Sequence, residues 1–170
     1  MSPQTPPGDS ATNPTGQING GTAPAGSQLC GNDMLNAFLA AGVRLPEGRT
    51  AGSADRYVYL DSNGNPQEVQ VCFQWNNPSA PEGAGNVMIV SGLTPELARM
   101  LDQMVDGKPD AQEGRFRLQG VDNGTANAPG VQWNRTNDDT AASLAGAEGD
   151  NLQRDESQVV TVVAVYKMNQ

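Results

Sequence analysis

Apolar and polar residues alternate most clearly in the stretch 69–75. Its apolar side chains are Val69, Val71, Phe73 and Trp75. A period of two places such side chains on one face of a β-strand, so Cys72 falls on the opposite face. Residues 57–60 are also typical of a strand, and residues 61–66 are rich in Asp, Asn and Gly, which favour tight turns. The pattern predicts a β-hairpin.

A period of three to four residues, typical of a helix, occurs in two places. The apolar side chains of the first are Leu35, Phe38 and Leu39. Asn32 or Asp33 is the expected N-cap, because a short polar side chain can accept a hydrogen bond from a free amide of the first turn. Gly42 is the expected C-terminal stop, which gives a short first helix.

The second helical stretch follows a short buried strand that we expect at residues 87–90. Its apolar side chains are Leu97, Met100, Leu101, Met104 and Val105. We expect Thr94 as the N-cap, Pro95 at the first helical position and Gly107 at the end. The spacing predicts an amphipathic helix with one apolar face.

Two further strands are expected after the second helix. Residues 115–118 alternate, and residues 159–166 are the most β-prone run and are apolar on both faces, which predicts an interior place in the sheet. With 20 Gly and 12 Pro, much of the chain must form turns and loops. We therefore expect an α+β fold: an antiparallel β-sheet with two short helices, rich in loops.

Residues 1–28 differ in composition from the rest of the chain. They hold five Pro and five Gly, and Ile18 is their one sizeable aliphatic residue beyond Met1. Such a segment buries too little apolar area to offset the entropy lost when its backbone is ordered. We expect a disordered tether over residues 1–28 and a single α+β domain over residues 29–170. The alternative is that the segment packs onto the domain as an extended strand.

The chain has two cysteines, Cys30 and Cys72. In a Gly-rich chain without His, such a pair favours a disulfide and an oxidising compartment. The first helix, which follows Cys30, is the natural element to cover the strand face that carries Cys72. The alternative is two unrelated buried thiols.

Charge and composition exclude several classes of function. The net charge is −9 and the ten Lys and Arg are scattered, so neither nucleic acid nor an anionic membrane is an expected partner. No apolar run approaches the roughly 20 residues of a membrane span. The residues after Met1 are neither basic nor apolar, so we do not expect them to act as a signal peptide. Because there is no His, the Ser–His and Cys–His nucleophile pairs are impossible. We expect no enzymatic activity and no cofactor; paired carboxylates are the remaining catalytic option.

Two features leave room for ligand binding. Asp150, Asp155 and Glu156 could supply oxygen ligands to Ca²⁺, although a solvated acidic loop explains them as well. Residues 61–65 begin like a Ca²⁺ loop but fit a hairpin turn better. The aromatic residues of a conceivable carbohydrate platform are Tyr57, Tyr59, Trp75 and Trp133. The alternative for these four is packing in the core and the hairpin.

The segment 87–109, VMIVSGLTPELARMLDQMVDGKP, followed by GRFR at residues 114–117, resembles a segment of type IV pilins and minor pilins. There, a short strand and a Gly-Leu turn lead into a small helix that ends at Asp-Gly, and a strand follows. The resemblance implies a non-enzymatic extracytoplasmic α+β head, often with one disulfide, that assembles into a filament. A pilin begins with a long hydrophobic helix, whereas residues 1–28 here are rich in Pro and Gly.

We therefore expect a structural or assembly subunit of a bacterial surface filament, with other protein subunits as partners. It would lie outside the cell or on the cell surface, and on the periplasmic side before assembly. The alternative is a tethered extracellular binding module or adhesin that recognises a carbohydrate or a Ca²⁺-dependent partner.

Overall fold

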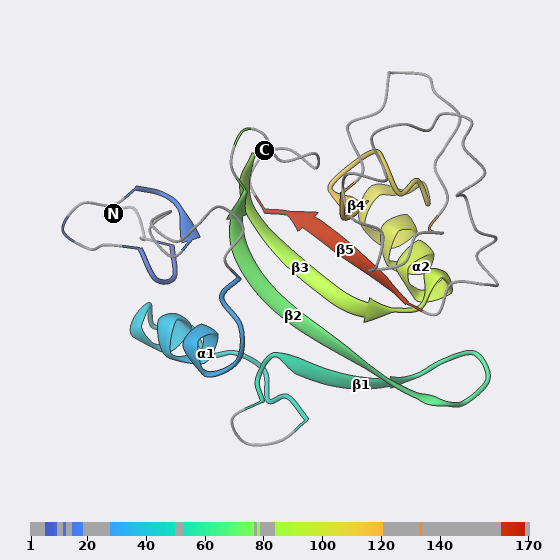
Figure 1. Cartoon of the computed structure of the whole chain (residues 1–170), viewed down its shortest axis with the longest axis horizontal. Coiled ribbons are helices and arrows are strands. Elements are labelled where there is room, and N and C mark those ends of the chain that lie inside the picture. The colour runs from blue at the N-terminus through green and yellow to red at the C-terminus, as the bar shows by residue number, and fades with distance from the viewer. Residues whose placement is uncertain are drawn as a thin grey trace.

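The computed structural model describes residues 6–9, 12, 15–18, 28–49, 53–76, 78, 84–120, 133 and 161–168. The elements are α1 (Gly31–Ala40), β1 (Arg56–Leu60), β2 (Pro66–Asn76), β3 (Gly85–Leu93), α2 (Pro95–Asp106), β4 (Phe116–Leu118) and β5 (Val162–Lys167). All the strands named here join one antiparallel sheet (Figure 1). The predicted α+β class is confirmed.

The sheet has the strand order β1-β2-β3-β5-β4. β1 and β2 form the predicted hairpin, and Oδ1 of Asp61 closes its turn by accepting hydrogen bonds from the amides of Asn63 and Asn65, at 2.9 and 2.8 Å. β5 lies between β3 and β4, so the expected interior strand is confirmed. β1 and β4 are the two edges of the sheet.

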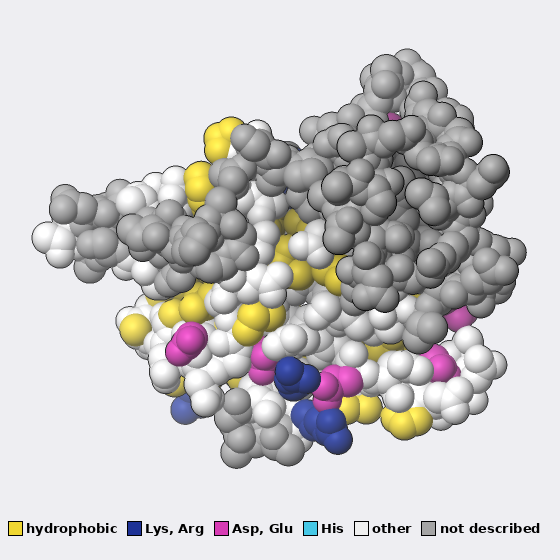
Figure 2. All heavy atoms as spheres, in the orientation of Figure 1, with side chains coloured by type: hydrophobic (Ala, Val, Ile, Leu, Met, Phe, Trp, Pro, Cys, Tyr) yellow, Lys and Arg dark blue, Asp and Glu magenta, His cyan; other side chains and the backbone are white. Residues whose placement is uncertain are grey.

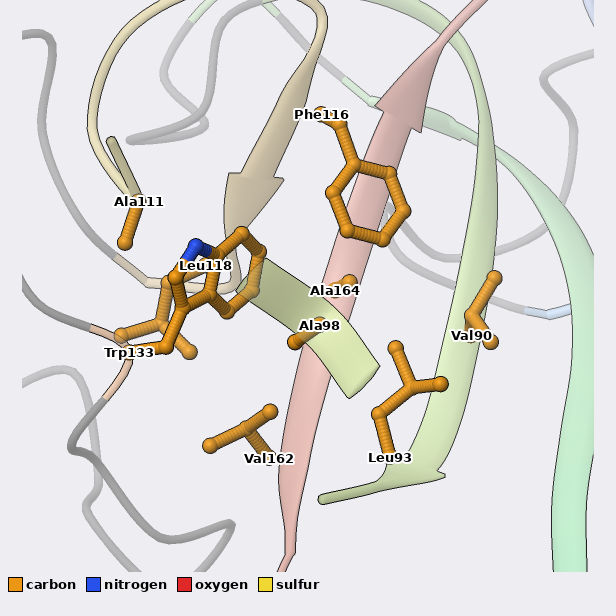
Figure 3. Close-up of a cluster of buried hydrophobic side chains, with 9 residues drawn as sticks. All are labelled: Val90, Leu93, Ala98, Ala111, Phe116, Leu118, Trp133, Val162 and Ala164. Carbon is orange, nitrogen blue, oxygen red and sulfur yellow. The ribbon is translucent and has the colours of Figure 1, made fainter. Parts of the chain in front are cut away.

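The main core lies between α2 and one face of the sheet (Figure 3). Its buried side chains are Val90, Leu93, Ala98, Ala111, Phe116, Leu118, Trp133, Val162 and Ala164. A smaller cluster on the opposite face combines Cys72 with Val87, Ile89 and Val165. The sheet is therefore apolar on both faces along β3 and β5, as expected for strands in its interior.

α1 differs from the prediction at its start and in the face that it buries. The N-cap residue is Cys30, whose sulfur is bonded to another cysteine and makes no capping hydrogen bond. Met34 and Phe38 are buried, whereas Leu39 is 52% exposed. The spacing thus identified Phe38 correctly but missed Met34. Gly42, with φ of 76°, follows the end of the helix as predicted.

α2 begins and ends where the sequence predicts. Oγ1 of Thr94 accepts a hydrogen bond from the amide of Leu97 at 3.3 Å, and Gly107 ends the helix with φ of 78°. The expected apolar face is only partly correct, because Ala98 and Asp102 are the fully buried side chains. Ala98 packs in the main core, so the helix turns this residue to the sheet and part of the predicted stripe toward solvent.

That stripe divides into a covered and an exposed half. Leu97 and Leu101 pack partly against the core, whereas Met100 and Met104 are 56% and 79% exposed. Val105 is also exposed. In the described part of the chain, neither helix has the length and apolar character that a bilayer crossing demands.

The described part of the N-terminal segment contacts the domain. Ile18 is buried and packs against α1. Its amide donates to Oδ1 of Asn86 at 2.8 Å, and Nδ2 of Asn86 donates to the carbonyl of Gly16 at 2.8 Å. The alternative to a tether was that residues 1–28 pack onto the domain, and the contact of Ile18 is such packing. Most of residues 1–28 lie outside the described residues, so the tether stays a prediction.

Cys30 and Cys72 form the predicted disulfide. Beside it, Leu29 pairs with Phe73 in an antiparallel bridge. The chain therefore enters α1 along the part of β2 that lies beyond its pairing with β1. The disulfide closes a loop across a sequence separation of 42 residues. It therefore fastens the start of α1 to β2 and restricts the unfolded chain.

Replacing both cysteines with alanine, in the variant Cys30→Ala/Cys72→Ala, removes this restriction. We expect a loss of about 4 kcal/mol in the free energy of unfolding, on the loop-entropy model. Urea unfolding followed by circular dichroism measures it, and the native protein under a strong reductant is the control. A loss below about 1 kcal/mol in both would contradict the expected role of the bond.

Gly92 interrupts the pairing of β3 with β5. It has φ of 85°, and a Cβ there would lie 2.2 Å from the carbonyl oxygen of Glu68. Gly64, in the hairpin turn, has φ of 80°, but a Cβ there would meet no neighbour within 4 Å. The two glycines therefore share a left-handed backbone and differ in the space around them.

This difference predicts unequal effects of alanine. Gly64→Ala should lower the free energy of unfolding by about 1 kcal/mol, which is the backbone cost alone. Gly92→Ala should lower it by at least about 3 kcal/mol, because Glu68 must also move. Urea titrations of the two variants measure both values. Equal losses would mean that the close approach of β2 to Gly92 does not constrain the fold.

Candidate interaction surface

The two edges of the sheet differ in how their backbone groups are satisfied. At β4, the amide of Phe116 donates to Oδ2 of Asp106 at 2.8 Å, and the amide of Leu118 donates to the carbonyl of Ala111 at 2.8 Å. The segment between α2 and β4 therefore covers the outer side of β4. An edge covered in this way cannot accept another strand.

The outer side of β1 is covered at one end only. Asp55, just before β1, accepts a hydrogen bond from an amide of β2 at 2.7 Å, so by alternation the even-numbered residues of β1 turn their backbone groups outward. The carbonyl of Arg56 accepts from the amide of Arg49 at 2.8 Å. Among the described residues, none hydrogen-bonds to the outward groups of Val58 or Leu60.

The same two residues expose apolar side chains. Val58 is 51% exposed and Leu60 is 68% exposed. We call this pair of residues the β1 edge. Unpaired backbone and exposed apolar surface together make a template for strand addition, which folded proteins generally avoid unless the surface is used.

An ion-pair cluster flanks the β1 edge. Glu68 of β2 lies opposite Val58, and its Oε1 and Oε2 are 2.7 and 2.6 Å from Nη1 of Arg56 and Arg49. Hydrogen bonds from Arg56 and Arg49 lower the pKa of Glu68, so its carboxylate stays ionised. Figure 2 shows basic, acidic and hydrophobic side chains together along the lower rim, over β1. The three charged side chains of this cluster, Arg49, Arg56 and Glu68, together carry a formal charge of +1, in a chain of net charge −9.

Tyrosine side chains hold β1 in place from its other face. The hydroxyl of Tyr59 donates to the carbonyl of Gly92 at 3.1 Å and accepts from the amide of Thr94 at 2.9 Å. The hydroxyl of Tyr57 donates to the carbonyl of Ala54 at 2.8 Å. The strand is thus fixed before any partner arrives, which reduces the entropy lost on binding.

The calcium candidates divide between described and undescribed parts of the chain. Asp150, Asp155 and Glu156 lie outside the described residues, so their role stays a prediction. Asp61 belongs to the hairpin turn, where a hydrogen bond from the amide of Asn65 is the first cause of its lowered pKa. Within the described ranges, no cluster of three His, Cys, Asp or Glu could hold a metal ion. Turn formation, rather than Ca²⁺ binding, explains residues 61–65.

The aromatic residues do not form one exposed platform. Trp133 is fully buried and packs on Phe116, with 5.3 Å between ring centroids. The hydroxyls of Tyr57 and Tyr59 donate hydrogen bonds to backbone carbonyls of the domain itself. Packing in the core and the hairpin, the stated alternative to a carbohydrate platform, is confirmed for Trp133.

A buried carboxyl group that the sequence did not single out lies beside Trp133. Oδ2 of Asp102 accepts a hydrogen bond from Nε1 of Trp133 at 3.0 Å, and Oδ1 has no partner among the described residues. Burial raises the pKa of Asp102 to about 7, and the charges of Asp106 and Asp110 add to the rise. Because the group is fully buried, it cannot reach a substrate, and it links α2 to Trp133 instead.

The raised pKa predicts a stability that falls as pH rises. Between the ordinary aspartate pKa of 3.8 and the raised pKa of about 7, the folded state keeps a proton on Asp102 that the unfolded state has lost. This group's contribution is therefore complete below pH 3.8 and is lost by about pH 7, on the order of 4 kcal/mol in all. No His titrates in this window, because the chain has none.

Asp102→Asn tests this directly, because the amide oxygen can still accept from Trp133. We expect the free energy of unfolding of the native protein to fall between about pH 5 and pH 7. Over the same range, the free energy of unfolding of the variant should change much less. Glu113→Gln, at an exposed carboxylate, is the control and should keep the native decline. A native stability that rises over this window would show that Asp102 is ionised when folded.

Comparison with known proteins found no matching family model, curated protein or solved structure. The resemblance of residues 87–117 to type IV pilins therefore stays a prediction.

Proposed function

We propose that this chain is a non-enzymatic, extracytoplasmic assembly subunit that acts through protein–protein contacts, and that the β1 edge is one of its contact surfaces. The observation that carries the proposal is the asymmetry of the sheet. One edge is covered by the protein's own hydrogen bonds. At the other edge, no described residue bonds to the outward backbone groups of Val58 and Leu60, and their apolar side chains are exposed. Open edges of this kind are used for strand addition by partner chains.

The disulfide supports the extracytoplasmic part of the proposal. Bonds such as Cys30–Cys72 form and persist in oxidising compartments and are rare in the reducing cytosol. The bond closes a long loop and gives lasting stability to a domain outside the cell.

The pilin resemblance supports the assembly part. The segment that carries it contains β3, α2 and β4, which follow one another along the chain as a strand, a helix and a strand. We propose a surface filament as the assembly, in keeping with that resemblance. A carbohydrate-binding module is the weaker candidate, because Trp133 lies in the core.

Fractionation of the source cells tests the proposal. The free thiols are alkylated at the moment of lysis, and the protein is followed by intact mass and by sedimentation. We expect an oxidised chain outside the cytoplasm, in particles far larger than the 17.8 kDa monomer, which dissociate in denaturant. Cytosolic protein with two alkylated thiols, or an extracytoplasmic monomer, would rule the proposal out.

A further inference from the structure

We infer that the partner that pairs with the β1 edge is a second copy of this chain, in an antiparallel, two-fold arrangement. The inference rests on the proposed function and names the contact. It follows from the backbone of β1, from the side chains beside that backbone and from the charges at the two ends of the strand.

The backbone permits one register that satisfies every open group. Val58 and Leu60 both turn their amide and carbonyl outward. If Val58 of one copy lies opposite Leu60 of the other, each such pair exchanges both of its backbone hydrogen bonds. The two-fold axis generates the second pair, with the roles of the copies reversed. No outward group of either residue is then left unpaired.

The side chains suit the same register. Val58 and Leu60 share one face of β1, and in an antiparallel pair these side chains meet the same residues of the second copy. Each copy thus covers the exposed apolar side chains of the other. Tyr59 lies opposite Tyr59 of the second copy, and its hydroxyl stays bonded to Gly92 and Thr94.

The charges favour the antiparallel direction. Arg49 and Arg56 flank the start of β1, and Asp61 follows its end. Antiparallel pairing brings the acidic end of one strand toward the basic end of the other, whereas parallel pairing would place like charges together.

The length of the contact sets its strength. Arg49 already occupies the outward carbonyl of Arg56, so pairing is confined to Val58 and Leu60. A contact of this size is far below that of a standard interface, and we expect a weak dimer that forms only at high protein concentration. In a larger assembly, other contacts would raise the effective concentration of the two edges.

Sedimentation equilibrium of the purified full-length protein, over a wide concentration range, tests the inference. We expect a reversible monomer–dimer equilibrium in the native protein. Val58→Lys and Leu60→Lys should each weaken it by at least about tenfold, because a lysine on an edge strand opposes pairing. Met104→Lys, at a residue that is 79% exposed on α2, is the matched control and should leave the dissociation constant unchanged. Circular dichroism checks that each variant is folded.

Val58→Pro adds a variant that removes the outward amide of residue 58 and adds no charge. Its side chain stays apolar while the outward amide is lost, which an edge strand tolerates. We expect it to weaken the dimer as lysine does. If Met104→Lys abolishes the dimer, or if the β1 variants associate like the native protein, the inference is wrong.

Failure of the inference can be told apart from failure of the proposed function. In one outcome, the purified native protein stays monomeric at the highest concentration but forms large particles in its cells. This outcome would show that the partner of the β1 edge is not a second copy, and the proposed assembly role would remain. In the opposite outcome, the purified protein forms a dimer that depends on Val58, but the protein in its cells is cytosolic and reduced. This outcome would support pairing of two β1 edges and rule out the proposed extracytoplasmic assembly role.

Discussion

The need to satisfy the backbone groups at the edges of the sheet governs this structure. A strand in the interior finds partners on both sides, whereas an edge strand must find them elsewhere or present them to solvent. At β4 the carboxylate of Asp106 and the carbonyl of Ala111 supply the partners. Asp106 reaches them because Gly107 ends α2 directly after it, and the chain then turns back to β4. At β1, the amide of Arg49 and the carbonyl of Ser53 pair with the outward groups of Arg56, and within the described ranges the outward groups at the far end of the strand have no such partner.

The rest of the domain holds that open strand firmly. The hydroxyl of Tyr59 hydrogen-bonds to the carbonyl of Gly92, at the bulge in β3, and to the amide of Thr94, the N-cap of α2. These hydrogen bonds connect the edge strand to the elements that form the main core. On the same side of β2, beyond the start of β1, Leu29 pairs with Phe73 and the disulfide fastens the start of α1 to the sheet. The acidic group of Asp102 is buried within the same core and is satisfied in part by Trp133. A rigid edge with few internal partners is well suited to receive a strand from outside.

Local patterns in the sequence predicted most of the fold. The strand around Phe73, the turn residues after Leu60 and the Thr94–Pro95 start of α2 depend on a few neighbouring residues, and each was confirmed. The predicted core face of that strand was only partly correct, because its apolar residues are half-buried and the buried positions, Cys72, Gln74 and Asn76, lie on the opposite face. The buried faces of the helices were harder, because they depend on tertiary contacts. Met34 is buried by α1 packing with Ile18, and Met100 is exposed because the helix turns Ala98 to the sheet.

The candidate surface was not predicted, and the reason is physical. Val58 and Leu60 look like ordinary strand residues, and their exposure depends on the position of β1 at the edge of the sheet, which no local pattern encodes. A signal was present in residues 57–60, which are apolar on both faces although the strand precedes a polar turn. Likewise, nothing near Asp102 in the sequence indicates that Trp133 will come to lie beside it.

Amide hydrogen exchange of the oxidised protein, compared between dilute and concentrated solutions, tests the central claim most directly. The amides of Phe116 and Leu118 should be protected at every concentration, because partners within the domain hold them. The amides of Val58 and Leu60 should exchange rapidly in the dilute protein and become protected as the concentration rises. Strong protection of Val58 and Leu60 in the dilute monomer, or no gain on concentration, would contradict the account.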